Sequence, residues 1–191
     1  MSEHRLTAPL SPADAAKLKI GDVVYLDGEI ITSAGFPTHK RIDDCLNAGT
    51  EPPVDLHGAC FFHMGSLSDD NGKPIYVNPT TSTRFNQFMP RFIKHFRLSG
   101  LAGKGGLDHA SATAIGTVGA VYFSMIGGAA PLLTQGIVEI IETGWDDLIM
   151  QFRLTRFKVE NFGPLTVAID ANGTSIYEDL TASAQDRLPE I

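Results

Sequence analysis

Short runs of apolar residues are separated by turn-forming residues, and the spacing within each run predicts a strand or a helix. Residues 23–26 and 30–32 are β-rich and predict two strands, and Asp27-Gly28 between them predicts a tight hairpin turn. Further strands are predicted at 59–63 and 75–77. Four large side chains then recur at helical spacing and predict a helix face buried in the core: Phe85, Phe88, Met89 and Phe92.

Capping residues mark the expected helix boundaries. Ser11 followed by Pro12 predicts the start of a short helix, because serine is a favoured N-cap and proline fits the first helical position. Thr38 is the predicted cap of a second helix, which would end at Gly49. Residues 108–115 predict another short helix. These helices alternate with the strands, which is typical of an α/β domain.

The last third of the chain predicts a helix, two strands and a polar end. A glycine-rich opening predicts a helix over 127–137. Strands are predicted at 152–159 and 165–169, with a hairpin turn at 170–173 after the second. Residues 181–191 are polar, and we expect them to form a frayed tail.

Length and composition predict one soluble domain over residues 1–191. The irregular interleaving of strands and helices predicts the α/β class with a mixed sheet. The net charge of −7 argues against a broad phosphate-binding surface, so nucleic acid is not an expected partner. No apolar run reaches the roughly 18 residues that span a bilayer, and the N-terminus lacks the apolar core of a signal peptide. We therefore expect a cytoplasmic protein without a membrane partner. Two cysteines, Cys45 and Cys60, are too few to complete a metal site alone.

Candidate chemistry begins with the hydroxyl-rich residues 80–83, which stand just before the predicted amphipathic helix. Their hydroxyls and backbone N–H groups would lie where the helix dipole favours an anion. Arg84 adds a guanidinium that can hold a carboxylate through two hydrogen bonds. The same residues also fit simple helix capping beside a solvated arginine, and the spacing alone leaves both readings open.

A second candidate lies in the glycine loop at 103–106. The glycines let the backbone approach a ligand, and Lys104 supplies a point charge. The loop is not a phosphate-binding P-loop, because Leu107 and Asp108 follow where that motif requires other residues. An ordinary turn explains the loop equally well.

A third candidate is the run His39-Lys40-Arg41. These residues would form a second cationic patch, or they would simply be the solvated start of a helix. His63 ends a predicted strand, which is a common place for a site residue as well as for a structural histidine. No pair of histidines has metal-ligand spacing.

Taken in order along nearly the whole chain, these segments resemble the β subunit of the iron–sulfur hydro-lyases. That family includes L(+)-tartrate dehydratase and the class I fumarate hydratases, in which the corresponding part is the C-terminal domain. The matching segments are Gly21-Asp22-Val23-Val24-Tyr25-Leu26, His39-Lys40-Arg41, Pro79-Thr80-Thr81-Ser82-x-Arg84, Gly103-Lys104-Gly105-Gly106, Gly127-Gly128-Ala129-Ala130 and Phe162-Gly163-Pro164-Leu165.

The resemblance implies a swivelling β/β/α domain that closes over a partner. It implies an α subunit that carries a [4Fe–4S] cluster, so that the chain works in a heterodimer or heterotetramer on a small hydroxy-di- or tricarboxylic acid. The family's proton-transfer threonine corresponds to Thr80, and its substrate-binding arginine and lysine correspond to Arg84 and Lys104. The matching segments add Thr81, His39 and Lys40 to the candidate substrate-binding residues.

One departure bears on the substrate. The family usually carries Arg-Asp shortly before its His-Lys segment, whereas residues 33–38 hold no arginine. Thr80, Arg84 and Lys104 remain, which favours retained hydro-lyase chemistry on an altered acid. Two other functions stay open: a non-catalytic closing or assembly subunit, and a carboxylate-binding module that acts without a partner.

Overall fold

The backbone forms a seven-stranded mixed sheet that curls until two of its strands meet a second time. The computed structural model describes residues 1–69 and 73–188. The strand order is β1-β2-β3-β6-β7-β9-β8, and β4 and β5 form a separate two-stranded sheet. The strands are β1 (Glu3–Ala8), β2 (Val23–Thr32), β3 (Cys60–Phe62), β4 (Met64–Ser68), β5 (Pro74–Pro79), β6 (Gly100–Gly103), β7 (Val121–Ser124), β8 (Ile137–Gly144) and β9 (Leu154–Ile169).

The long strand β9 closes the sheet on itself. Strands β2, β3, β6 and β7 pair in parallel, and β9 pairs antiparallel with both β7 and β2. The pairing therefore runs in a circuit from β2 through β3, β6, β7 and β9 back to β2. Such closure leaves fewer unpaired strand edges and encloses an interior that side chains can fill.

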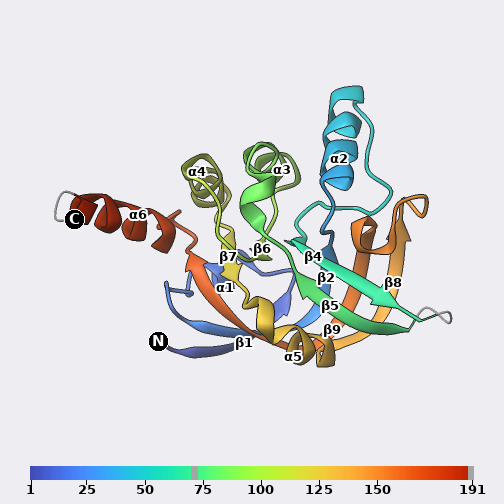
Figure 1. Cartoon of the computed structure of the whole chain (residues 1–191), viewed down its shortest axis with the longest axis horizontal. Coiled ribbons are helices and arrows are strands. Elements are labelled where there is room, and N and C mark those ends of the chain that lie inside the picture. The colour runs from blue at the N-terminus through green and yellow to red at the C-terminus, as the bar shows by residue number, and fades with distance from the viewer. Residues whose placement is uncertain (70–72, 189–191) are drawn as a thin grey trace.

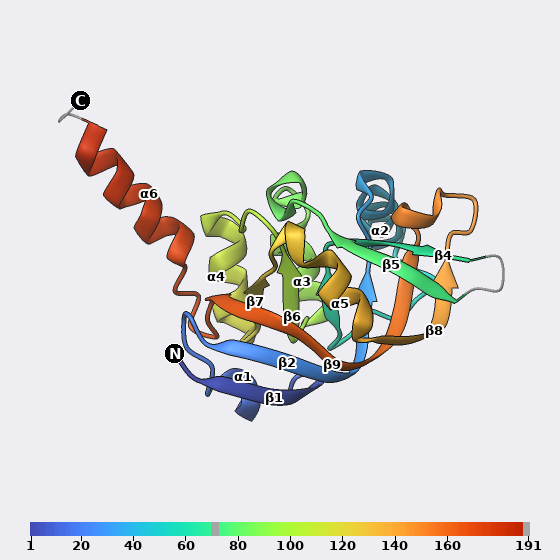
Figure 2. The ribbon, with the colours of Figure 1, turned by 60° about the horizontal axis from the view of Figure 1, so that its bottom comes forward.

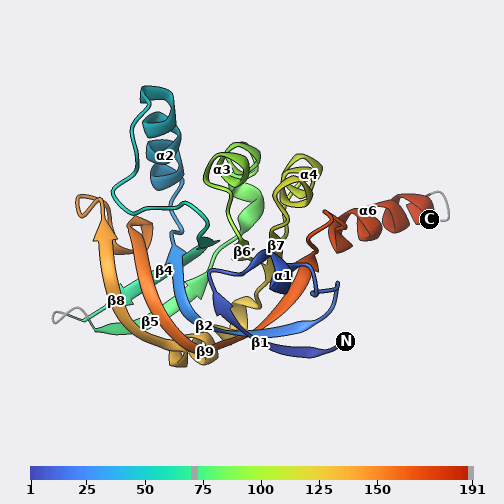
Figure 3. The same ribbon diagram turned by 180° about the vertical axis from the view of Figure 1, so that it is seen from behind.

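The helices lie mainly on one side of this curled sheet. Figure 1 shows α2, α3 and α4 beside one another on that side, whereas β1 and α1 lie on the opposite side in Figures 2 and 3. Helix α6 extends away from the other elements in both Figure 1 and Figure 2. The helices are α1 (Pro12–Ala15), α2 (Phe36–Ala48), α3 (Met89–Phe96), α4 (His109–Val118), α5 (Ala130–Gln135) and α6 (Ile176–Arg187), with 3-10 turns η1 (Ser82–Phe85), η2 (Gly127–Ala129) and η3 (Met150–Phe152).

Successive residues of the central strands enter two different cores. Phe61 and Tyr122 pack with the helix layer, whereas Phe62 and Phe123 pack inside the curled sheet. This alternation follows from the two-residue period of a strand. All four rings are fully buried, and burying such a side chain contributes roughly 1.5–3 kcal/mol. The central strands are therefore fixed in position from both faces.

Several predictions are confirmed. The α/β class and the mixed sheet are present. Ser11 caps α1, because its hydroxyl accepts a hydrogen bond from the Asp14 amide. The four side chains at helical spacing are buried: Phe85, Phe88, Met89 and Phe92. Among the described residues, none of the helices has the length and apolar character that a membrane span requires.

The predicted hairpin turn at Asp27-Gly28 is wrong, because β2 continues unbroken through it. Gly28 has a φ of 102°, and a Cβ added there would collide with the carbonyl of Ala8 on the neighbouring strand. The register between β2 and β9 shifts at this glycine. The glycine therefore signals a bulge and a close backbone approach rather than a chain reversal.

The predicted start of the second helix is also wrong, because α2 begins at Phe36 with Gly35 as its N-cap. The Thr38 hydroxyl instead donates a hydrogen bond to the carbonyl of Phe152. Proline at position 37 fits the first helical turn, which is why the helix starts earlier than the threonine suggested.

Three predictions for the C-terminal part need correction. The two strands expected at 152–159 and 165–169 are one continuous strand, β9, and the helix expected over 127–137 ends at Gln135, before the unpredicted strand β8. Residues 181–187 belong to helix α6 rather than to a frayed tail, while 189–191 lie outside the described residues. The turn at 170–173 forms, but it leads into α6.

Candidate anion-binding pocket

Residues 80–82 are held by backbone hydrogen bonds between His63, which follows β3, and Lys104, which follows β6. The Thr80 amide donates to the carbonyl of His63 at 2.8 Å, and the Thr80 carbonyl accepts from the Lys104 amide at 3.0 Å. The Ser82 amide then donates to the Lys104 carbonyl at 2.8 Å. The hydroxyl-rich segment and the glycine loop, 24 positions apart in the sequence, are therefore joined at the end of β6.

Gly103 permits this close approach. A Cβ added to it would collide with the Ser82 hydroxyl and would lie 3.1 Å from Cβ of His63 and 3.2 Å from the Thr80 carbonyl oxygen. Gly103 has an ordinary φ, so the requirement for glycine comes from space and not from backbone strain.

A pocket of about 260 Å³ opens beside this junction. Thr80 and Lys104 form part of its wall, and Ala34 and Gln151 line it from two other segments. The hairpin of β4 and β5 supplies the remaining lining residues: Gly65, Ser66, Leu67, Tyr76, Asn78 and Pro79. Lys104 is the one charged residue among those that line this pocket within the described parts of the chain.

The lysine and the arginine of the two motifs have no acidic partner among the described residues. Lys104 is half-buried, and Arg84 is exposed on η1, close in sequence to Thr80 but not part of the pocket wall. Across residues 1–69 and 73–188, neither side chain forms an ion pair. Nζ of Lys104 would lie 3.5 Å from a Cβ on Gly127, so the side chain passes close to the glycine that opens η2. Both charges are free to meet an incoming anion.

The structure does not bring the other predicted residues to the pocket wall. Thr81 is half-buried and directs its methyl group toward Gly105, where an added Cβ would lie 3.2 Å away. His39 is fully buried in the aromatic core, with its ring stacked on Phe85 at 3.8 Å between centroids. A direct substrate contact by His39 is therefore inconsistent with its position.

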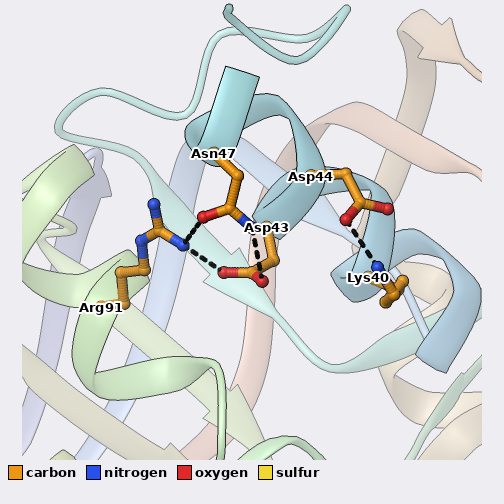
Figure 4. A network of polar contacts seen from close by, with 5 residues as sticks. All are labelled: Lys40, Asp43, Asp44, Asn47 and Arg91. Atoms are coloured by element: carbon orange, nitrogen blue, oxygen red, sulfur yellow. Dashed lines mark hydrogen bonds and ion pairs between the residues drawn. The ribbon is translucent and has the colours of Figure 1, made fainter. Parts of the chain in front are cut away.

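Lys40 is exposed, but its ammonium lies 2.5 Å from Oδ1 of Asp44 on the next turn of α2 (Figure 4). On the same helix, Asp43 and Asn47 bind the guanidinium of Arg91 at 2.6 and 2.7 Å (Figure 4). The cationic patch predicted from the run at 39–41 therefore does not form. His39 is buried, and Lys40 and Arg41 are each paired with an aspartate.

Behind the pocket lies a buried polar network that sequence patterns alone did not indicate. Nδ1 of His63 lies 2.8 Å from the Ser82 hydroxyl, which also accepts a hydrogen bond from the Tyr122 hydroxyl at 2.9 Å. Burial lowers the pKa of His63 well below its ordinary value and raises the pKa of Tyr122. Burial also lowers the pKa of His39 to about 4, against a smaller opposing effect of its hydrogen bond to Gly35. All three groups are therefore neutral at pH 7.

The chain itself does not fit an iron–sulfur cluster. Cys60 is fully buried in β3, with its sulfur 3.5 Å from the Ser99 hydroxyl, and Cys45 is half-buried on α2. Neither cysteine lines the pocket. A cluster held by cysteine thiolates would therefore need ligands from another chain.

Gln151 is the pocket residue that sequence reasoning missed most completely. It belongs to η3, which is tied to residues 33–38 by hydrogen bonds: the Ala34 amide donates to the Gln151 carbonyl at 3.1 Å, and the Ser33 hydroxyl donates to Phe152 at 3.2 Å. These partners lie more than 100 positions apart, and no local motif marks either side.

Comparison with known proteins gives a consistent set of similarities. A family model described as the fumarase C-terminus matches residues 2–180. A putative L(+)-tartrate dehydratase subunit beta of Methanocaldococcus jannaschii is 34% identical over 95% of both chains. The L(+)-tartrate dehydratase subunit beta of Escherichia coli K12 is 31% identical over 97% of this chain and 93% of its own. A putative class I fumarate hydratase of Geobacillus stearothermophilus is 31% identical over 99% of this chain but only 37% of its own length.

Proposed function

Because the chain belongs to the fumarase C-terminus family, we propose that it is the β subunit of a heteromeric hydro-lyase. It would reversibly add or remove water on a small hydroxy-di- or tricarboxylic acid. The observation that carries this proposal is the shared pocket, whose wall includes both Thr80 and Lys104, a lysine that forms no ion pair within the described residues. Names of relatives support the reaction class, and the pocket supports the role of this chain in it.

In this proposal Lys104 binds a carboxylate of the acid, with Arg84 contributing from the rim. Removing a proton from the carbon next to a carboxylate transfers negative charge onto that carboxylate in the transition state. A nearby ammonium therefore stabilises the transition state more than the bound acid. This differential effect is what a catalytic cation must supply.

Thr80 would transfer the proton. A threonine hydroxyl is a weak base at its ordinary pKa, so it needs a cationic setting to act. The unpaired Lys104 on the same pocket wall supports that setting. Both backbone groups of Thr80 are hydrogen-bonded, so the hydroxyl is presented from a fixed backbone.

A [4Fe–4S] cluster on an α subunit would supply a Lewis-acidic iron for the hydroxyl that leaves as water. The two cysteines of this chain lie away from the pocket, which supports placing such a cluster on a partner. The chain would cover the acid and exclude water from it. We propose a heterodimer or heterotetramer on these grounds.

The pocket wall formed by Ala34 bears on which acid is used. The side chain there is a methyl group, and the same pocket is also lined by the apolar Leu67 and by Tyr76. Apart from Lys104, the described residues that line the pocket offer no cation to a second carboxylate, so that carboxylate would have to be bound by the partner subunit or by Arg84. The proposed substrate class therefore stays wider than fumarate or tartrate.

The test is to co-express the chain with a candidate α subunit, reconstitute the cluster without oxygen, and assay hydration and dehydration over a panel of hydroxy acids. The chain alone should show no turnover, and the complex should. Thr80→Val, which keeps the shape but removes the hydroxyl, should lower kcat at least about 100-fold. Thr83→Val, at an exposed position three residues on, is the matched control and should change kcat less than about twofold.

Each outcome has a distinct meaning. A complex that turns over none of the acids would contradict the hydro-lyase function. An active complex whose kcat is unchanged by Thr80→Val would show that another residue transfers the proton. An active complex indifferent to both Thr80→Val and Lys104→Met would make the chain a non-catalytic closing subunit.

A further inference from the structure

Two buried histidines lie side by side behind the pocket, and each has one bonded and one unpartnered ring nitrogen. His39 and His63 are both 0% exposed, and their ring centroids are 5.2 Å apart. Nε2 of each ring is buried and forms no hydrogen bond within the described residues. An unsatisfied buried polar group is costly, so two adjacent ones call for a physical explanation.

The bonded nitrogen of His39 fixes the position of its proton. Nδ1 lies 2.7 Å from the carbonyl oxygen of Gly35. A carbonyl can only accept a hydrogen bond, so Nδ1 carries the proton in the neutral ring. Nε2 of His39 is therefore an acceptor without a donor.

The opposite assignment follows for His63. The Tyr122 hydroxyl donates to the Ser82 hydroxyl, which leaves the proton of Ser82 free to be donated to Nδ1 of His63. Nδ1 is then the acceptor, and the proton of the neutral ring sits on Nε2. The unpartnered nitrogen of His63 is a donor without an acceptor.

We propose that His63 and His39 act as a pair of positioning residues, in which Nε2–H of His63 pairs with Nε2 of His39 in the working enzyme and holds Thr80 in place. The proposal rests on the proposed role of Thr80. A small ring rotation or one bridging water completes the link, because the two unpartnered atoms have complementary roles on neighbouring rings. The link joins a continuous row of groups from the Gly35 carbonyl to the Tyr122 hydroxyl.

This row connects two walls of the pocket. At one end Gly35 follows Ala34, which lines the pocket. At the other end His63 contacts residues 80–82 twice. Its carbonyl accepts a hydrogen bond from the Thr80 amide, and its ring is hydrogen-bonded to the Ser82 hydroxyl. A shift of either histidine would therefore move the backbone that presents the Thr80 hydroxyl.

The surroundings favour neutral rings and so preserve the pairing. His39 packs against Phe61, Phe85, Phe88 and Phe92, and His63 packs against Phe61 and Phe85. No carboxylate, ammonium or guanidinium of the described residues forms an ion pair with either ring. An imidazolium on either ring would place two donors face to face and break the row.

Tautomers can be read directly from the isolated chain, without a partner subunit. Long-range proton–nitrogen NMR spectra of the imidazole rings at pH 7 should show His39 with its proton on Nδ1 and His63 with its proton on Nε2. Ser82→Ala should move the Nδ1 resonance of His63 while leaving His39 in the same tautomer. A proton on Nδ1 of His63, or a cationic ring at either site, would overturn the proposal. This readout is independent of whether the chain is a hydro-lyase subunit.

The positioning role is tested in the reconstituted complex with two amides. His63→Asn places an amide oxygen near the former Nδ1, so an acceptor for the Ser82 hydroxyl remains. His63→Gln places its amide near the former Nε2, so the acceptor for Ser82 is lost. We expect kcat to fall about 10- to 100-fold for both variants, because Gln loses the link to Ser82 and Asn loses the link to His39, with KM within about threefold for both. A wild-type kcat in either variant would contradict positioning by the histidine pair.

Ser82→Ala removes only one hydroxyl, and it tests the same link to His63 if the His63 variants do not fold. It should lower kcat about tenfold at unchanged KM, and it should raise the hydrogen-exchange rate of the Thr80 amide. An unchanged kcat with unchanged exchange would overturn the proposal. If the wild-type complex itself shows no activity, the proposed function is rejected. The NMR result for the two tautomers then still tests the pairing of the histidines.

Discussion

The chain presents two regions that look cationic in sequence, and the structure separates them by their partners. Around α2, the cations Lys40, Arg41 and Arg91 face the carboxylates of Asp44, Asp147 and Asp43 at 2.5 to 2.6 Å. Figure 4 shows two of these contacts, Lys40 with Asp44 and Arg91 with Asp43. At the pocket, Lys104 and Arg84 meet no carboxylate of the described residues.

Three positive and three negative groups make the α2 region neutral as a whole, whereas the pocket keeps its positive charge. An anion is drawn by the local field rather than by the number of basic residues, since the whole chain carries a net charge of −7. A basic run therefore predicts an anion site only when no acid of the same fold lies within reach.

The largest expected effect is the change with pH that buried His39 causes in the free energy of unfolding, which distinguishes it from the paired charges of Lys40 and Arg41. Its folded pKa of about 4 lies below its ordinary 6.5, because burial disfavours the charged ring. Above pH 6.5 the ring is neutral in both folded and unfolded chains, so it does not affect stability there. As the pH falls from 6.5 to 4, the unfolded chain binds a proton that the folded chain rejects, and about 3 kcal/mol of unfolding free energy is lost.

Urea unfolding of the wild type and of His39→Gln at several pH values measures this loss. The difference in unfolding free energy between the two proteins should be constant above pH 7 and should shrink between pH 6.5 and 4. A difference independent of pH would show that His39 is protonated or exposed, and the run at 39–41 would then be cationic after all.

The next effect disrupts the pocket while leaving α2 intact. Gly103→Ala would force a methyl group against the Ser82 hydroxyl and close to the Thr80 carbonyl. We expect a loss of about 2–3 kcal/mol of unfolding free energy. Gly128→Ala is the matched control, because a Cβ there meets nothing within 4 Å, and it should cost less than about 0.5 kcal/mol. Equal unfolding midpoints for the two variants would contradict the close packing of residues 80–82 on Gly103.

A smaller effect compares two arginines, one unpaired and one paired. Arg84→Ala in the reconstituted complex should lower kcat/KM about tenfold, since a charge-assisted hydrogen bond to the acid is lost. Arg41→Ala removes a guanidinium that is already paired with Asp147, so kcat/KM should stay within about twofold of the wild type. Similar losses in both variants would remove the distinction between the two regions.

The smallest effect concerns the exposed network on α2. Arg91→Ala removes contacts to Asp43 and Asn47, and it should lower the unfolding free energy by about 0.2–1 kcal/mol at low salt. The loss should diminish in 1 M salt, because exposed pairs are screened. A loss that is large and independent of salt would show that this network is more than a surface ion-pair cluster.

The sequence predicted what local chemistry determines. Helix capping by Ser11, the buried face of Phe85 to Phe92 and the α/β class follow from spacing and residue type, and the structure confirms them. The motifs at 80–84 and 103–106 were each ambiguous alone. The structure joins them through the hydrogen bonds of Lys104, although the roles of Thr80, Arg84 and Lys104 stay predictions.

Long-range partners account for the rest. Gly28 marks a bulge instead of a turn because Ala8 lies against it, and Gln151 reaches the pocket because η3 is bound to residues 33–38. The burial of His39 depends on aromatic rings from three other segments. None of these contacts leaves a trace in the neighbouring sequence, so residue type alone misplaced Gly28 and His39 and gave no sign of Gln151.

The most direct test of the central claim compares two lysines in the reconstituted complex. Lys104→Met and Lys40→Met each remove one ammonium and keep an unbranched side chain of similar size. If the unpaired charge at the pocket binds the acid, kcat/KM should fall at least about 100-fold for Lys104→Met and less than about twofold for Lys40→Met. Equal kcat/KM values for the two variants would contradict the assignment of this pocket as the substrate site.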